Sequence, residues 1–172
     1  MEWINLLSSI SGATIRMSAP LIFAALGGLF SERSGVINIA LEGKMLAGAF
    51  TAAAVTTLTH SPLLGFLAGG IAGMVMAAIY GLFVINFKAN QIVTGTAITI
   101  LAAGSVPFAS QILFQNTGST PEVAMGNRFI HEPIIAVWII MVLVWLWFKY
   151  SPYGLWHKFA GEHPDALQTS GI

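Results

Sequence analysis

Residues 45–87 read MLAGAFTAAAVTTLTHSPLLGFLAGGIAGMVMAAIYGLFVINF and contain no Asp, Glu, Lys or Arg. A helix that crosses a bilayer needs about 20 apolar residues, so this run is too long for a single crossing. The polar residues Thr59, His60 and Ser61, followed by Pro62, interrupt it near its middle. We therefore expect two consecutive membrane-spanning helices that are joined by a short turn.

The rest of the chain has the same apolar character. Its 172 residues are 56% hydrophobic and 8% charged, whereas about 25% of the residues of a soluble domain are charged. The apolar runs are continuous, which favours helices over the alternating strands of a membrane barrel. We expect an all-α, polytopic transmembrane helical bundle of about five spans, with a membrane core at residues 1–150 and a cytoplasmic segment at residues 151–172. The expected spans are residues 15–30, 35–58, 62–86, 91–114 and 133–150.

Basic residues predict the orientation of the spans, because short cytoplasmic loops are enriched in Lys and Arg. The sequence around Met1 lacks the basic region of a secretory signal peptide, so the first apolar segment is expected to stay as a span. Alternating spans then give the two sides unequal numbers of basic residues: Arg33, Lys88, Lys149 and Lys158 against Arg16 and Arg128. We expect the N-terminus outside and the C-terminus in the cytoplasm.

The composition disfavours several functional classes. Seven basic and seven acidic residues cancel, which gives no electrostatic reason to expect nucleic acid as a partner. The chain has no Cys, and its four His residues lack the spacing of metal ligands, so we expect no metal and a solvated position for each His. No phosphate-binding loop and no hydrolase motif occurs. We therefore expect neither an enzyme nor a bound cofactor.

The third expected span carries a small residue at every fourth position. On a helix this spacing forms one ridge, which lets another backbone approach closely. A packed bundle needs such a ridge, although a Gly- and Ala-rich chain also produces the spacing by chance. The ridge consists of Gly65, Gly69, Gly73, Ala77 and Gly81.

Residues 31–44 hold the densest group of polar side chains near a span. Glu42 and Lys44 lie two positions apart, so a regular helix would point them in different directions. Gly43 between them allows the chain to leave the helix, which would give an interrupted second span of the kind that lines transport sites. The spacing is equally compatible with a loop that ends at Lys44. Gln91 and Thr94, which open the fourth span, are further polar candidates.

The last residues of the chain predict a short helix at the cytoplasmic face. Pro164 and Asp165 suit a first helical turn, since Pro is tolerated there and an acidic residue favours the positive end of the helix. Gly171 suits the position just after the helix. Such a helix would serve as a docking element for a soluble partner, or as an ordinary loop helix.

Several of these motifs together resemble one family. Residues 24–28 (AALGG), 31–39 (SERSGVINI) and 41–43 (LEG) are similar to the signature of bacterial ABC-importer permeases of the branched-chain amino acid, simple sugar and nucleoside group. Residues 89–95 (ANQIVTG) resemble the next segment of the nucleoside-type members. Residues 154–172 are similar to the cytoplasmic loop that couples these permeases to their ATPases. The chain departs from the family pattern at Lys44, Lys158, Phe159, His163 and Leu167.

The resemblance implies a permease subunit of an ATP-driven importer in a bacterial plasma membrane. Its partners would be a second permease subunit, two cytoplasmic ATPase subunits and an extracytoplasmic solute-binding protein, and its solute a nucleoside or, next, a simple sugar. The implied translocation motif comprises Asn38, Glu42, Gly43, Gln91 and Thr94. The implied ATPase-coupling residues are Gly161, Glu162, Pro164, Asp165 and Gly171. Members of this family are longer, so the resemblance also implies an N-terminal portion of a permease.

The sequence is also compatible with two other interpretations. A secondary transporter or channel subunit would use Glu42 as a site for a coupling ion and would need no docking helix. The other alternative to an importer permease is a truncated permease without transport function.

Overall fold

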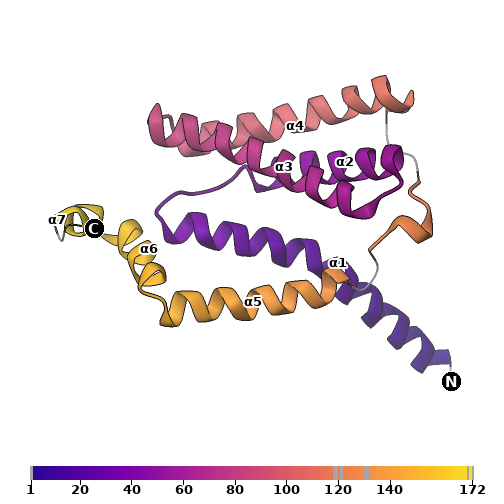
Figure 1. The fold of residues 1–172 in the computed structure, drawn as a ribbon, viewed down its shortest axis with the longest axis horizontal. Helices are drawn as coiled ribbons and strands as arrows, with labels where there is room; N and C mark the ends of the chain where they lie inside the picture. Colours follow the sequence, from indigo (N-terminus) through magenta and orange to yellow (C-terminus); the bar gives the residue numbers. More distant parts are fainter. Residues whose placement is uncertain (1, 118–119, 121, 130–131, 170, 172) are drawn as a thin grey trace. The chain divides into compact units, whose positions relative to one another are not determined.

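The structure is a computed structural model in which every ordered element of the described residues is helical. This confirms the expected all-α class. The described residues are 2–117, 120, 122–129, 132–169 and 171. In chain order (Figure 1) the elements are α1 (Glu2–Arg33), α2 (Leu41–Thr59), α3 (Pro62–Gly81), the π-helical turn η1 (Leu82–Asn86), α4 (Gln91–Phe114), the 3-10 turn η2 (Met125–Asn127), α5 (Glu132–Tyr150), α6 (Pro152–Glu162) and α7 (Pro164–Thr169).

Four helical segments of the described chain are long and apolar enough to cross a membrane. They are Trp3–Arg33, Pro62–Asn86, Gln91–Phe114 and Pro133–Tyr150. The last three coincide with the spans expected at residues 62–86, 91–114 and 133–150. The span expected at residues 35–58 corresponds to α2, which starts later, at Leu41. Helix α2 is not among the four, because its Thr residues and its two charged residues lower its mean hydropathy. The expected number of about five spans is therefore approximate.

The breaks between the long helices follow from local chemistry. His60 adopts a left-handed conformation with φ 55° after α2, Ser61 is extended, and Pro62 occupies the first turn of α3. The Asn90 side chain accepts hydrogen bonds from the backbone N–H groups of Ile92 (2.9 Å) and Val93 (3.2 Å), which caps α4. Both breaks lie between spans that the sequence predicts, at residues 60–61 and 87–90.

Helix α1 is longer than the span expected at residues 15–30, because it begins at Glu2. Hydroxyl side chains in its first half bond to carbonyl groups of the same helix: Ser9 to Leu6 (2.9 Å) and Thr14 to Ile10 (2.9 Å). These bonds satisfy the polar atoms without ending the helix. Arg16 therefore lies inside the helix.

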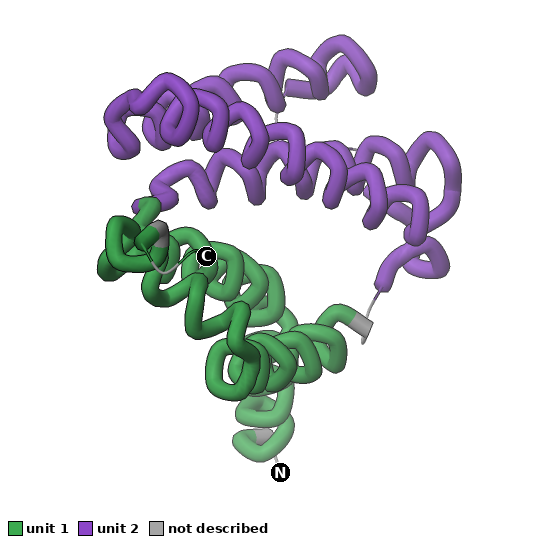
Figure 2. The backbone as a smooth tube through the Cα atoms, turned by 60° about the vertical axis from the view of Figure 1, so that its left-hand side comes forward, with its two compact units in different colours: residues 1–36, 130–172 green, residues 37–129 purple. Residues whose placement is uncertain are grey.

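The chain forms two compact units, which Figure 2 distinguishes by colour. Unit 1 comprises residues 1–36 and 130–172 and contains α1, α5, α6 and α7. Unit 2 comprises residues 37–129 and contains α2, α3 and α4. The division expected at residue 150 does not coincide with these units and stays a prediction.

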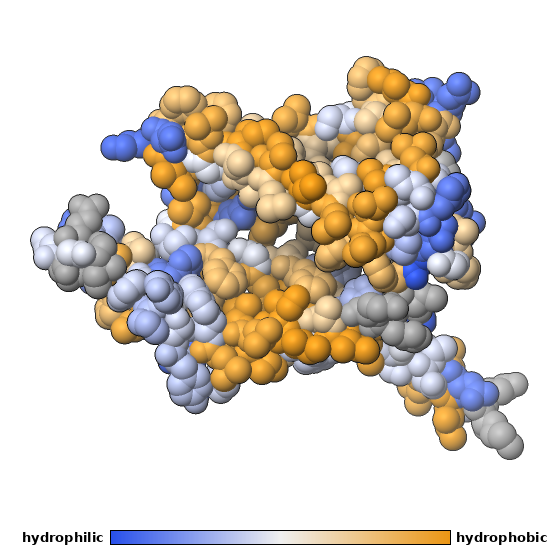
Figure 3. Space-filling model, in the orientation of Figure 1, coloured by the Kyte–Doolittle hydropathy of each residue, from blue (hydrophilic) through white to orange (hydrophobic). Residues whose placement is uncertain are grey.

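Large apolar side chains lie on the outer surfaces of the long helices in both units. Phe66 on α3 is 66% exposed, Ile100 on α4 is 71% exposed and Leu143 on α5 is 57% exposed. In the space-filling view of Figure 3, apolar residues cover the lengths of the helices and hydrophilic residues gather toward their ends. This distribution is typical of helices that are solvated by lipid.

Candidate functional site

The chain leaves the helix between α1 and α2, and it does so at Gly35. Gly35 has φ +82°, a conformation that favours glycine, and the next helix begins only at Leu41. Gly43, where the sequence suggested an interruption, lies inside α2 and is buried. The suggested break at Gly43 is therefore wrong, and the interruption precedes α2.

In unit 2 the segment before α2 is held through both backbone groups of Ile37. Its N–H donates to Oε1 of Gln91, the first residue of α4, at 2.8 Å. Its carbonyl accepts from the hydroxyl of Tyr80 on α3 at 2.5 Å. A non-helical backbone at the edge of an apolar bundle needs such partners, because unpaired N–H and C=O groups are costly there. Side chains from two helices thus replace the hydrogen bonds that a helix would supply.

Lys44 completes this arrangement. Its ammonium group donates to Oδ1 of Asn38 at 2.8 Å and lies 4.5 Å from the centre of the Tyr80 ring. The ring face attracts the cation, and the amide oxygen provides a polar partner. We name Ile37, Asn38, Lys44, Tyr80 and Gln91 the entry cluster, because they surround the start of α2.

The start of α2 also packs closely on α4. A Cβ added to Gly43 would lie 2.8 Å from Cα of Thr99 and 3.1 Å from the carbonyl oxygen of Ile98. A Cβ on Gly95 would lie 3.0 Å from Cβ of Ile39. Both glycines therefore allow the backbone at the start of α2 to approach that of α4. This contact fixes the position of the entry cluster along α4.

The predicted translocation residues divide into two groups. Asn38 and Gln91 belong to the entry cluster, and Gly43 packs directly beside it. Glu42 is exposed in the first turn of α2, where its charge is favourable at the helix N-terminus. Thr94 is half-buried in the first turn of α4.

The sequence interpretation missed Tyr80, which is buried with 4% of its surface exposed. One signal was available: Tyr80 is the only Tyr in the uncharged run of residues 45–87. A phenol in such a run usually finds a hydrogen-bond partner when it is buried.

In unit 1 two glycines of α6 pack the C-terminal segment closely on other helices: Gly161 on the end of α1 and Gly154 on the end of α5. A Cβ on Gly161 would lie 2.9 Å from the Gly35 nitrogen and closer still to the Arg33 carbonyl oxygen. A Cβ on Gly154 would lie 2.8 Å from Cα of Phe148. Gly161, one of the predicted coupling residues, therefore joins α6 to the last residues of α1.

His157 lies between these glycines and faces a cluster of aromatic rings. Its Nε2 donates to the carbonyl oxygen of Phe30 at 2.7 Å, and its ring centre lies 5.8–5.9 Å from those of Phe30, Trp147 and Phe148. The expectation of a solvated His is wrong at this position, because α6 turns the side chain onto α1 and α5.

The other predicted coupling residues point away from this contact. Glu162, Pro164 and Asp165 are exposed, and Glu162 lies 3.7 Å from Lys158 in a surface ion pair. Pro164 and Asp165 open α7 as expected, and Gly171 has φ +79°.

The predicted ridge of α3 contacts α2 along part of its length. A Cβ on Gly65 would overlap the Thr56 hydroxyl, and a Cβ on Gly69 would lie 2.8 Å from the Gly48 carbonyl oxygen. Gly73 has nothing within 4 Å, and Gly81 meets only a side-chain carbon of Ile85 at 3.9 Å. Ala77 is exposed. The first half of the ridge is thus a helix contact, and the described residues leave the second half uncovered.

The sequence is similar to those of several curated ABC transporter permease proteins. The chain is 36% identical to the guanosine ABC transporter permease protein NupQ of Bacillus subtilis, over 100% of this chain and 61% of the relative. It is 30% identical to the putative glucose ABC transporter permease protein TsgC13 of Haloferax volcanii, over 96% of this chain and 55% of the relative. The nucleoside ABC transporter permease protein NupC of Lactococcus lactis is 28% identical, over 100% of this chain and 62% of the relative.

The chain thus spans about three fifths of the length of these curated relatives. No solved structure matches it significantly. A family model described as branched-chain amino acid transport system / permease component matches residues 11–172. The resemblance of the signature motifs is confirmed: this multi-pass membrane protein belongs to the family of branched-chain amino acid transport system permease components.

Proposed function

We propose that this chain contributes to the membrane pathway of an ATP-driven importer whose solute is a nucleoside. The observation that carries the proposal is the 36% identity with the guanosine permease protein of Bacillus subtilis over the whole chain. The nucleoside permease protein of Lactococcus lactis supports the same class of solute. A simple sugar is the second candidate, because the putative glucose permease protein of Haloferax volcanii is 30% identical.

The entry cluster supports a role in the pathway. It keeps a non-helical backbone segment and the charge of Lys44 paired beside three helices, and such segments occur in membranes only where protein or water satisfies them. In this role Asn38 and Gln91 position the segment, Gly43 sets its contact with α4, and Glu42 and Thr94 are available at the first turns of α2 and α4. Opening and closing of the pathway would move α2 relative to Tyr80 and Gln91.

The C-terminal segment supports contact with an ATPase subunit. Glu162, Pro164 and Asp165 are exposed and form the polar end of unit 1, while Gly161 packs on the end of α1. A displacement of α7 by the ATPase would therefore reach α1 through a backbone contact rather than through flexible side chains. This role places the C-terminus in the cytoplasm and the N-terminus outside. A second permease subunit and an extracytoplasmic binding protein complete the proposed importer.

Uptake by a chimera tests the proposal. In Bacillus subtilis lacking NupQ, the matching part of NupQ is replaced by this chain, and uptake of radiolabelled guanosine and glucose is measured. The proposal predicts guanosine uptake that stops when residues 164–171 are deleted, although the deleted chimera still reaches the membrane. Uptake that survives the deletion favours a secondary transporter. Absence of uptake by an intact, membrane-inserted chimera contradicts the proposal and supports a chain without transport function.

A further inference from the structure

Unit 1 contains a cavity of about 450 Å³ between α1, α5 and α6, which the entry cluster and the proposed ATPase contact do not use. Three cations line it: Arg33 at the end of α1, Lys149 at the end of α5 and Lys158 on α6. The chain has only seven Lys and Arg residues, so a large share of its positive charge converges on one site.

The positive charge of this cavity is poorly neutralised. Among the described residues, no acidic side chain lines it. Lys158 has Glu162 at 3.7 Å, but both side chains are about half-exposed, at 47% and 54%, and such pairs are weak. The Lys149 ammonium lies 4.5 Å from the Trp145 ring centre and 5.1 Å from that of Tyr150. These rings orient the cation and leave its charge available to an anion.

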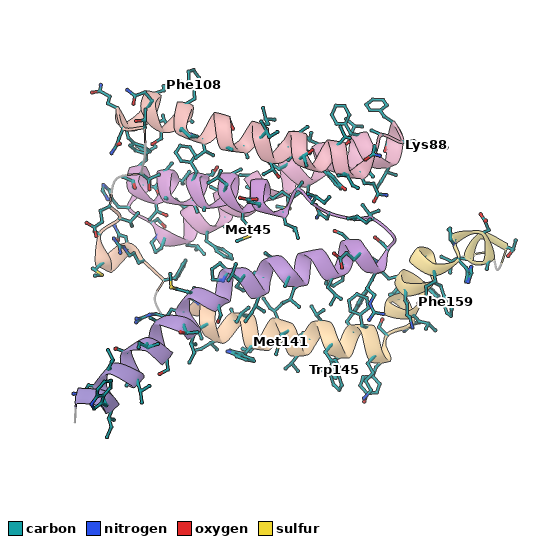
Figure 4. The ribbon with its side chains drawn as sticks, turned by 180° about the vertical axis from the view of Figure 1, so that it is seen from behind. Met45, Lys88, Phe108, Met141, Trp145 and Phe159 are labelled. Atoms are coloured by element: carbon teal, nitrogen blue, oxygen red, sulfur yellow. The ribbon has the colours of Figure 1, made fainter. Side chains whose placement is uncertain are left out.

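The other side of the cavity is apolar. Leu26 and Leu29 line it from α1, and Met141, Val144 and Trp145 line it from α5. The two helices pack against each other, and Figure 4 labels Met141 and Trp145 along α5. Because the apolar residues precede the cations along both α1 and α5, the cavity is cationic at the helix ends and apolar toward their middles. A ligand that fits it has an anionic head and a hydrocarbon tail.

We propose that this cavity binds an anionic phospholipid, with its phosphate on Arg33, Lys149 and Lys158 and the upper part of an acyl chain along Leu26, Met141 and Val144. The helix ends that carry these cations lie where a bilayer has its headgroups, and the aromatic residues Trp145 and Tyr150 belong to the same layer. Basic pockets between membrane helices are typical sites for acidic headgroups. A free phosphate would use the cations but not the apolar wall.

The bound lipid would connect three elements, because its phosphate would bridge α6 to the ends of α1 and α5. The site depends only on the membrane location of the chain and not on its solute or its ATPase. Its test therefore stands apart from the uptake experiment.

Lipid binding by the purified full chain tests the proposal. Native mass spectrometry in detergent measures retention of phosphatidylglycerol and of phosphatidylcholine with identical acyl chains. We expect the wild-type chain to prefer phosphatidylglycerol, and R33Q/K149Q to weaken its binding by about 30-fold, from about fivefold for each basic residue. The matched control R16Q/K88Q removes the same charge outside the cavity and should retain the lipid. Circular dichroism checks that each variant is folded.

Other outcomes overturn the proposal. Equal retention of the two lipids, or equal losses in the two double variants, shows nonspecific surface binding. Full competition by inorganic phosphate or glycerol phosphate at the concentration of the lipid shows a free-anion site. A V144F variant, which fills the apolar wall and keeps every charge, should also reduce phosphatidylglycerol binding; unchanged binding contradicts the assignment of the acyl chain. If R33Q/K149Q weakens phosphatidylglycerol binding only when an ATPase subunit is present, the cations belong to a contact with that protein instead.

Discussion

Tyr80→Phe tests the entry cluster at a single atom. The substitution removes the hydroxyl that donates to the Ile37 carbonyl at 2.5 Å and keeps the ring that lies 4.5 Å from the Lys44 ammonium. Loss of one such hydrogen bond costs about 1 kcal/mol, and a buried acceptor left without a donor costs about 1–3 kcal/mol. Because Ile37 as a whole residue is 53% exposed, its carbonyl can regain some solvation, so we expect the lower value.

For a chain of this length, 1 kcal/mol corresponds to a shift in Tm of about 2–4 °C. The assay is thermal unfolding of the purified chain in detergent, followed by circular dichroism. Tyr80→Leu should lower the Tm further, because it also removes the ring beneath Lys44 and leaves unfilled volume. Tyr150→Phe is the matched control, since Tyr150 is 67% exposed and the substitution keeps its ring; its Tm should not change.

A double-mutant cycle separates the two functions of Tyr80. Lys44→Met should lower the free energy of unfolding by the same amount in the wild-type and Tyr80→Phe backgrounds, because both contain the ring. It should lower it by less in the Tyr80→Leu background, where the ring is absent. An unchanged Tm for Tyr80→Phe, or equal effects of Tyr80→Phe and Tyr80→Leu, refutes the account of the entry cluster.

Three further predictions concern helix contacts, and each is measured as a change in the same thermal unfolding. Gly65→Ala should destabilise the chain by about 1–3 kcal/mol because the new Cβ overlaps the Thr56 hydroxyl, whereas Gly73→Ala, with nothing within 4 Å, should be neutral or stabilising by up to about 1 kcal/mol. Gly161→Ala should also destabilise the chain by about 1–3 kcal/mol, because the backbone carbonyl of Arg33 cannot move aside. Gly104→Ala is the control, since Gly104 has open space around it. Equal Tm values for the two variants would contradict the close contact of α6. His157→Ala should lower the Tm and expose residues 152–162 to faster hydrogen exchange, because it removes the 2.7 Å bond to the Phe30 carbonyl; unchanged exchange would exclude the anchoring role.

Much of the helical arrangement is predictable because polar residues punctuate an apolar sequence. The starts of the spans at residues 62 and 91 follow from Pro62 and from the Asn90 cap, which are local signals. The start of α2 was harder to predict, since Gly35 and Gly43 are equally permissive as residues. Only packing distinguishes them: Gly43 meets the backbone of Thr99, and Gly35 turns the chain.

The candidate site was predictable in part for the same reason. Asn38 and Gln91 stood out as amides near a span, and they do belong to the entry cluster. Tyr80 and His157 did not stand out, because their partners are backbone carbonyls at Ile37 and Phe30, many residues away in the sequence. A carbonyl carries no residue-specific signal, so such contacts are readable only from the fold.

Site-specific cross-linking tests the central claim most directly. The chain has no Cys, so single cysteines can be placed at Asp165 and, as the control in a turn that we expect on the outer side of the membrane, at Ser61. In membranes that contain the NupQ chimera, each is treated with a photoactivated, Cys-linked reagent and probed for the ATPase subunit. An importer subunit with a cytoplasmic C-terminus predicts a covalent adduct from D165C and none from S61C. Labelling of D165C by a membrane-impermeant thiol reagent in intact cells, without any ATPase adduct, would contradict it.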